Sequence, residues 1–231
     1  MTANNLGKVR LGWWASHDYK RRSVEHDLQS WPGWAGFMRL FEKADNPPYP
    51  RDSKKYAMLK DSRRYAIIIF ETGCREMEAV KLKPSQFRWD EDSILVENAP
   101  VLKKGRRATR DILIKLDDKN PLGYSLVEYL EACEPDEYLM PGLKKFSREV
   151  EPWRHVSPKT VYNRITEMSP ELWPHALRGY RASMLVNERG FSVQNLMKWF
   201  SWRNADSAVH YTATKDMAEA MGIDRIPQGR G

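Results

Sequence analysis

The sequence predicts an α+β protein that is mainly helical and has one small three-stranded antiparallel sheet. Most of the chain shows helical start and stop signals around stretches of helically spaced apolar residues. Strand-like stretches separated by turn signals are clear only between residues 87 and 114. With 231 residues, of which 41% are hydrophobic, the chain is long enough for one substantial domain, with or without a small appendage.

The beginning of the chain differs in composition from the remainder. Residues 1–48 include a basic Lys20-Arg21-Arg22 cluster, and residues 23–44 are expected to be helical with a break at Pro32-Gly33. Prolines then indicate a linker, because proline lacks the backbone donor that a helix needs: Pro47, Pro48 and Pro50. We therefore expect a short helical and basic segment at 1–48 and the main domain at 49–231.

A long buried helix is expected near the start of the main domain. Residues 52–72 have a helical pattern, and the stretch from Tyr65 to Phe70 is apolar on all sides, as in a helix surrounded by other elements. Gly73 ends this pattern. A second helix is expected from Arg75 to Leu82.

The three expected strands follow one another as an antiparallel meander. They cover residues 87–89, 94–96 and 111–114. The connection between the last two strands contains the strongly basic turn Lys-Lys-Gly-Arg-Arg-Ala-Thr-Arg at residues 103–110. This turn is the densest cluster of positive charge in the main domain.

From Pro121 onward the pattern is helical again. Pro158, preceded by a serine, and Pro174 are typical helix starts, while Gly190 is a typical helix stop and Ser192 a typical cap. The helices expected in this half cover residues 124–133, 158–168, 174–189, 192–200, 205–211 and 215–221.

Composition excludes several classes of protein. Cys74 and Cys133 are too few for a disulfide framework or a four-ligand zinc site, so no structural metal is expected. No stretch approaches 18 consecutive apolar residues and no signal-peptide core opens the chain, which predicts a cytoplasmic protein without a membrane partner. The net charge of +7 favours a polyanionic partner, because lysine and arginine displace counterions from phosphates.

Four residue types suited to phosphate chemistry occur close together in the C-terminal third. His175 and Arg178 lie three residues apart, so on a helix they point to the same side. The planar fork of arginine matches two phosphate oxygens, and histidine can donate to a third or move a proton. Trp202 adds an indole donor, and Tyr211 adds a phenol that nearby positive charge would activate as a nucleophile. Each residue alone has an ordinary structural explanation; together they indicate a phosphate site.

This C-terminal set resembles the tyrosine recombinase (phage-type integrase) family. His175-Ala-Leu-Arg178 is similar to the family's H-x-L-R box. The interval from Trp202 to Tyr211 is similar to the one between the family's histidine or tryptophan and its nucleophilic tyrosine. Gly179 departs from the pattern, since many members have a second histidine there.

Upstream motifs agree with the same resemblance, which extends over about residues 50–220 and implies that residues 1–48 are a reduced core-binding region. Thr-Gly-Cys-Arg-Glu-Met-Glu at residues 72–78 resembles the family's Thr-Gly-x-Arg-x-x-Glu box, which implies a catalytic Arg75 and a supporting Glu78. The family also places a catalytic lysine in a β-hairpin turn, where this chain has two neighbouring candidates. Because adjacent residues on a strand face opposite sides, we expect one of them to enter the site, with Lys104 favoured and Lys103 as the alternative. The same turn is expected to bind DNA through Arg106, Arg107 and Arg110.

The resemblance implies a tyrosine recombinase catalytic-domain fold and a mechanism that needs neither metal nor nucleotide cofactor. Tyrosine would attack a scissile DNA phosphate, form a 3′-phosphotyrosyl bond and release a 5′-hydroxyl. The two arginines would stabilise charge on the non-bridging oxygens, the lysine would protonate the leaving oxygen, and the histidine would assist proton transfer. The catalytic set that it implies is Arg75, Lys104, His175, Arg178, Trp202 and Tyr211.

The partners implied are double-stranded DNA, other copies of the chain and an accessory DNA-bending protein. Members of the family assemble as four protomers on two DNA sites, so a tetramer at nucleoid or host-cell DNA is expected. The expected helix at residues 215–221 either docks on a neighbouring protomer or folds back on its own domain.

Two other functions fit the same motifs. A type IB topoisomerase-like enzyme would nick and reseal DNA with the same residues but without strand exchange. A catalytically silent DNA-binding protein on the same fold would have no use for a tyrosine beside two arginines. The complete set of catalytic residue types therefore favours a recombinase.

Overall fold

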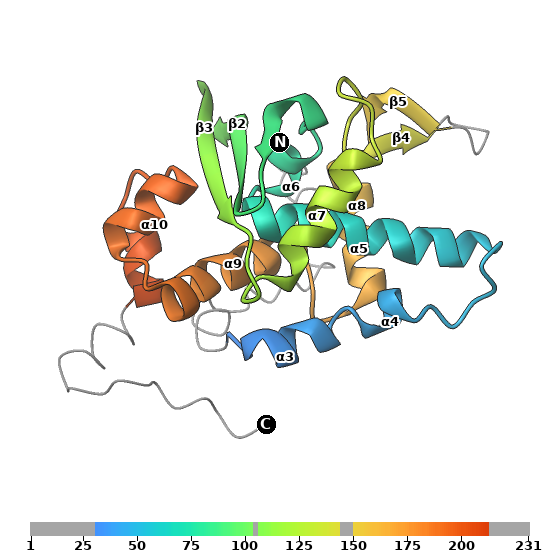
Figure 1. The fold of residues 1–231 in the computed structure, drawn as a ribbon, viewed down its shortest axis with the longest axis horizontal. Coiled ribbons are helices and arrows are strands. Elements are labelled where there is room, and N and C mark those ends of the chain that lie inside the picture. Colours follow the sequence, from blue (N-terminus) through green and yellow to red (C-terminus); the bar gives the residue numbers. More distant parts are fainter. Residues whose placement is uncertain (1–30, 104–105, 144–149, 213–231) are drawn as a thin grey trace, which may run out of the picture.

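The computed structural model describes residues 31–103, 106–143 and 150–212 of the chain. Helices dominate the described residues and a three-stranded antiparallel sheet stands beside them, which confirms the predicted α+β class (Figure 1). Of the sequence-based expectations, those for residues 1–30, for Lys104 and for the helix at 215–221 lie outside the described residues.

Helix α5 (Lys54–Thr72) is the centre of the fold. The side chain of Ser53 caps its first turn by accepting a hydrogen bond from the backbone N of Tyr56 at 3.1 Å. Residues 66–70 are completely buried, as their apolar sequence predicts. The helices that pack around it are α4 (Glu42–Asp45), α7 (Pro121–Glu131), α8 (Pro158–Met168) and α9 (Pro174–Arg189).

The segment that precedes α5 packs on the same core. Helix α3 (Gly33–Arg39) places the ring of Phe37 4.5 Å from that of Phe70 on α5 and 5.3 Å from that of Tyr180 on α9. The indole of Trp31 donates to Glu188 on α9 at 3.0 Å. Packing therefore continues across the boundary that the prolines suggest near residue 48.

The sheet consists of β1 (Phe87–Trp89), β2 (Ser93–Lys103) and β3 (Arg106–Lys115), in that order and antiparallel. The last two strands are longer than predicted, because a bulge between Val96 and Ala99 breaks the alternation of the sequence while pairing continues beyond it. At the bulge, Asn98 has φ 54° and donates its backbone N–H to the Asp111 carboxylate at 2.9 Å.

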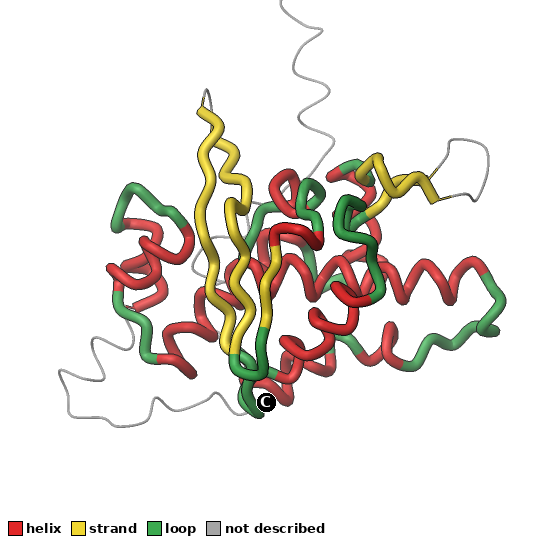
Figure 2. The backbone as a smooth tube through the Cα atoms, turned by 45° about the horizontal axis from the view of Figure 1, so that its top comes forward, coloured by secondary structure: helices red, strands yellow, loops and turns green. Residues whose placement is uncertain are grey.

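A second hairpin, of β4 (Pro141–Leu143) and β5 (Val150–His155), was not predicted from the sequence. Both strands contain proline, which cannot donate to a ladder and lowers the strand signal. Figure 2 shows this pair as a separate arm away from the three-stranded sheet. A short 3₁₀ turn, Pro84–Gln86, leads from α6 (Glu76–Ala79) into β1.

Helices α8, α9 and α10 (Val193–Phe200) begin and end where the sequence predicts, whereas α7 begins three residues earlier than expected. Ser157 and Ser192 cap α8 and α10 by accepting hydrogen bonds from backbone N–H groups three residues later. Gly190, with φ 68°, ends α9 in the left-handed conformation that glycine adopts without strain. Residues 206–212 form a further helical stretch, which carries Tyr211.

A buried ion pair joins α5 to α9. The guanidinium of Arg181 lies 3.0 Å from the Glu71 carboxylate, and neither side chain is more than 2% exposed. Asn120 donates a hydrogen bond to the same carboxylate at 3.1 Å. Burial raises the pKa of Glu71 and lowers that of Arg181, while the pairing opposes both shifts. The two opposite charges balance each other in the core and tie α5 to α9, while Glu71 Oε1 and Arg181 Nε have no hydrogen-bond partner among the described residues.

Candidate active site

The turn between α5 and α6 presents Arg75. Gly73 ends α5 with φ 56°, and Arg75 then occupies the N-cap position of α6. The carboxylate of Glu78 accepts hydrogen bonds from the Arg75 backbone N at 2.9 Å and from its guanidinium at 3.1 Å. It also accepts one from the backbone N of Leu102 at 3.1 Å, next to the hairpin turn of the sheet. One carboxylate that is 1% exposed therefore orients the arginine and anchors the base of the β2–β3 hairpin.

Gly73 also allows α10 to approach this turn. A Cβ atom on Gly73 would lie 2.5 Å from Cζ3 of Trp199 and 2.6 Å from Cε1 of Phe200. Such distances are far below van der Waals contact, so a side chain here would displace the end of α10. The glycine is therefore required by its backbone conformation and by the rings packed on it.

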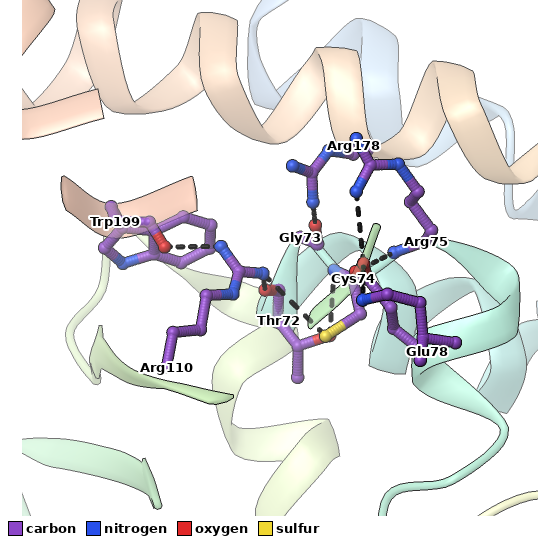
Figure 3. Close-up of polar contacts among 9 residues, drawn as sticks. Thr72, Gly73, Cys74, Arg75, Glu78, Arg110, Arg178 and Trp199 are labelled. Atoms are coloured by element: carbon purple, nitrogen blue, oxygen red, sulfur yellow. Dashed lines mark hydrogen bonds and ion pairs between the residues drawn. The ribbon is translucent and has the colours of Figure 1, made fainter. Parts of the chain in front are cut away.

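Arg178 lies beside Arg75 and is almost completely buried. Its guanidinium donates to the backbone O of Gly73 and lies 4.6 Å from the ring centroid of Phe200. Figure 3 shows the guanidinium groups of the two arginines next to each other. Burial, and then the charges of Arg110 and Arg75, lower the pKa of Arg178 to about 9, so it stays charged at neutral pH.

The charge of Arg178 is only partly balanced. Its Nη2 atom is buried and has no hydrogen-bond partner among the described residues. Glu78 is the carboxylate that opposes the repulsion from the neighbouring guanidinium groups. A buried donor without a partner, in a region of excess positive charge, favours binding of an anion there.

Trp202 and Tyr211 come from the C-terminal part of the chain and approach Arg178, whose Cζ lies 5.7 Å from the Trp202 ring centroid. Ser201 ends α10 in the left-handed conformation, and the next backbone N–H, of Trp202, donates back to Met197 O at 2.9 Å. This turn places the Trp202 ring parallel to that of Tyr211, with centroids 5.7 Å apart. The Tyr211 hydroxyl lies 3.5 Å from the position of a Cβ on Gly179, the residue that follows Arg178.

Four of the residues that the sequence singles out are thus neighbours in space: Arg75, Arg178, Trp202 and Tyr211. The sequence model of the phage integrase family matches residues 43–217, three quarters of the chain, and includes all four. The chain belongs to the phage integrase family. No curated protein sequence matches it significantly.

Solved structures of tyrosine recombinases share the family's catalytic-domain fold with this chain. The XerH site-specific recombinase in a post-cleavage complex with palindromic difH substrate has 18% identity and a TM-score of 0.56, over 87% of this chain and 55% of that one. The Tn1549 transposon integrase with circular intermediate DNA has 14% identity and a TM-score of 0.52, over 83% and 64%. The XerA recombinase has 19% identity and a TM-score of 0.50, over 84% and 65%. The chain thus spans between half and two thirds of the length of these proteins.

Of the remaining residues that the family motifs predict for the site, the structure describes His175 fully and the hairpin residues only in part. His175 lies in the first turn of α9, exposed and one turn before Arg178. Lys103 pairs with Arg106 at the end of the β2–β3 ladder, but Lys104 lies outside the described residues, as do the side chains of Lys103, Arg106 and Arg107. The choice between the two lysines, and DNA contact by the hairpin arginines, therefore remain predictions.

Arg110 is a correction to the sequence-based expectation. It was expected to bind DNA with the rest of the basic turn, but it is 7% exposed and donates hydrogen bonds to the backbone O of Thr72 at 3.0 Å and to that of Trp199. The turn ends earlier than expected, because β3 begins at Arg106 and pairs Arg110 with Ala99 inside the sheet. Its side chain therefore points into the space between α5 and α10.

Sequence reasoning also missed Phe200. The pattern Trp-Phe-Ser-Trp at residues 199–202 indicated packing around the expected donor Trp202, without showing which ring faces the arginines. Phe200 stacks on Trp202 at 4.5 Å with an interplanar angle of 11°.

Among the described residues no helix is long and apolar enough to cross a membrane, and no group of three or more metal-ligating side chains is present.

Proposed function

We propose that this chain is a site-specific tyrosine recombinase that breaks and rejoins DNA with Tyr211 as the nucleophile. The observation that carries the proposal is the position of the Tyr211 hydroxyl over Gly179, one residue from the buried Arg178. The tyrosine oxygen thereby lies against the turn of α9 that carries Arg178, whose buried guanidinium favours binding of an anion. This arrangement suits attack on a phosphate that the arginines have already bound.

In the proposed reaction, Arg75 and Arg178 donate to the non-bridging oxygens of the scissile phosphate. The donors are in place before charge develops, so they stabilise the pentavalent transition state more than the ground state. The indole of Trp202 packs between Phe200 and Tyr211 and adds a donor at the same phosphate. His175 assists removal of the tyrosine proton.

The Tyr211 oxygen then bonds to phosphorus as the bond from phosphorus to the 5′-oxygen breaks. The product is a 3′-phosphotyrosyl bond, and the leaving 5′-oxygen takes a proton from Lys104, or from Lys103 if that residue enters the site. Attack by a 5′-hydroxyl from a second strand reverses the step and completes the exchange. The phosphodiester energy is conserved in the covalent bond, so the proposal needs no nucleotide cofactor.

The proposed partner is double-stranded DNA, bound by four copies of the chain on paired sites, with an accessory DNA-bending protein as a further candidate. The net charge of +7 supports a polyanionic partner. The XerH and Tn1549 integrase structures contain DNA, which supports the same partner by similarity. The hairpin that carries the basic turn is anchored to the site through Glu78, which supports its contact with the same DNA.

The experiment that tests the proposal is the capture of a covalent adduct. The protein is incubated with a pool of random-sequence DNA duplexes that each carry a nick, so that the cleaved fragment diffuses away and the adduct accumulates. Denaturing electrophoresis reveals the adduct, and mass spectrometry of the digested product identifies the modified tyrosine. Tyr211→Phe should abolish the adduct and retain DNA binding.

Tyr124, which is 47% exposed on α7, provides the matched control. Tyr124→Phe should form the adduct as the wild-type chain does. An adduct that persists in Tyr211→Phe would rule out the proposed nucleophile. DNA binding without any adduct in the wild-type chain would indicate a silent DNA-binding protein. Relaxation of supercoiled DNA without exchange between two captured sites would indicate a nicking–closing enzyme.

A further inference from the structure

Arg110 holds together the ends of two helices that enter the site. Its guanidinium donates to the backbone O of Thr72, the last residue of α5, and to that of Trp199, next to the last residue of α10 (Figure 3). The final carbonyl groups of a helix have no partner within the helix and carry the negative end of its dipole. One buried cation thus satisfies carbonyl groups from two helix ends at once.

The chain that follows each of these helices carries a proposed site residue, Arg75 after α5 and Trp202 after α10. The chain leaving α5 passes through Gly73, whose backbone O accepts from Arg178, and then reaches Arg75. The chain leaving α10 turns at Ser201 and places Trp202 against Tyr211. The separation of the two helix ends therefore influences how far Arg75, and the Gly73 carbonyl that binds Arg178, lie from the turn that places Trp202 against Tyr211.

A column of aromatic rings extends this connection to the nucleophile. Two guanidinium groups lie close to the Phe200 ring, with Arg110 Cζ 5.7 Å and Arg178 Cζ 4.6 Å from its centroid. The next ring is Trp202, stacked on Phe200 at 4.5 Å, and the last is Tyr211, stacked on Trp202 at 5.7 Å. A shift of Phe200 would therefore reach Tyr211 through rings in contact.

We propose that Arg110 is a positioning residue for the reaction, which sets the geometry between the phosphate-binding arginines and Tyr211 without touching DNA. It does so by joining the ends of α5 and α10 and by fixing Phe200 at the base of the aromatic column. This inference rests on the proposed function. It replaces the expected role of Arg110 in DNA binding with one inside the protein.

The test compares three variants of the full chain on the same pool of nicked duplexes. Arg110→Met removes the donors and keeps much of the volume, Arg110→Lys keeps the charge with a single donor group, and Leu130→Ala destabilises α7 away from the site, where Leu130 is 1% exposed. Adduct formation is measured at saturating DNA and well below the melting temperature of each variant, and DNA binding is measured separately.

We expect Arg110→Met to form the adduct about 100-fold more slowly, since small displacements of reacting groups have effects of that size. DNA binding should change less than about threefold, because Arg110 contributes no contact to DNA, unlike the surface cations that determine affinity. Arg110→Lys should recover part of the rate. Leu130→Ala should react at close to the wild-type rate despite a lower melting temperature.

Equal rates for Arg110→Met and Leu130→Ala would show that Arg110 is only structural and would overturn the inference. A loss of DNA binding that matches the loss of rate would also overturn it, in favour of direct DNA contact. These outcomes differ from failure of the proposed function, in which the wild-type chain itself forms no adduct.

Discussion

The hydroxyl of Tyr211 lies 3.5 Å from the point that a Cβ atom would occupy on Gly179. This is an ordinary van der Waals distance, so a methyl group fits there and a longer side chain takes the space of the hydroxyl. Many members of the family have a histidine at this position. In this chain the glycine allows the phenol to rest directly on α9.

Substitution of Gly179 should therefore separate stability from catalysis. Gly179→Ala should raise the free energy of unfolding by about 1 kcal/mol, or the melting temperature by about 2–4 °C, because alanine is the better helix former. It should retain adduct formation. Gly179→Leu should displace the hydroxyl and slow the adduct about 100-fold, with DNA binding retained. Calorimetry and the nicked-duplex assay check both; a wild-type rate for Gly179→Leu would place the hydroxyl elsewhere.

Arg178→Met should lose cleavage far more than DNA binding. Removal of a preorganised donor from a charged transition state costs about 10²–10³ in rate, whereas one buried arginine adds little to binding of the DNA backbone. Single-turnover adduct formation and gel-shift titration measure the two quantities. Equal losses of rate and affinity would show that Arg178 only positions the DNA.

The lowered pKa of Arg178 predicts how stability depends on pH. Between about 9 and the ordinary value of 12.5, the unfolded chain holds a proton on this residue that the folded chain has released, so stability from this group rises with pH. Below about pH 9 the folded chain keeps this charge, and the free energy of unfolding is lowered by the full cost of burying it. The free energy of unfolding of Arg178→Met minus that of the wild-type chain should therefore decrease between pH 8 and 10.5, as measured by urea titrations. A difference that is constant over this range would contradict the pKa shift.

Glu78→Gln should weaken both the turn and the hairpin. The carboxylate accepts three hydrogen bonds, and an amide can replace only some of them, so we expect a loss of about 2 kcal/mol in the free energy of unfolding. Adduct formation should also slow, because Arg75 loses its orientation. Urea titration checks the first effect. Glu76→Gln in the same first turn of α6 is the control. An equal loss of stability there would show that the negative charge at the start of α6 stabilises the protein, rather than the hydrogen bonds of Glu78.

Asp117→Asn should destabilise the protein only when the carboxylate is ionised. Arg189 binds both Asp117 oxygens at 2.6 Å and is the main cause that lowers the pKa of Asp117 from 3.8. The stabilisation, about 0.5–1 kcal/mol for a pair near the surface, is complete above 3.8 and is lost as pH falls through the lowered value. Melting temperatures measured from pH 7 downward into acid test this, and a difference that does not shrink as the pH falls below 3.8 would contradict it.

Local signals in the sequence determine most of the helical fold. Helices begin or end next to four residues that capping rules identify in the sequence: Ser157, Ser192, Gly73 and Gly190. The hairpin of β4 and β5 was missed, because a proline in each strand lowers the strand signal. The strands beside the bulge at Asn98 were too short in the prediction, because the bulge interrupts the alternation of the sequence.

The site could be predicted as a set of residue types but not as a set of contacts. The family motifs identify Arg75, Arg178 and Tyr211, which the fold brings together. Arg110 was assigned to the surface, because a count of positive charges along the chain does not reveal which cation the sheet turns inward. Phe200 was missed because an aromatic run gives no sign of which ring stacks on an arginine.

The buried pair of Glu71 and Arg181 has a consequence for the evolution of this chain. Loss of either partner leaves an isolated charge in the core, at a cost of about 3–5 kcal/mol, whereas replacement of both by apolar residues of similar volume can be neutral. Single substitutions at these positions are therefore selected against, while the double change is tolerated. Across homologous sequences, positions 71 and 181 should covary, with an acid and a base together or two apolar residues together.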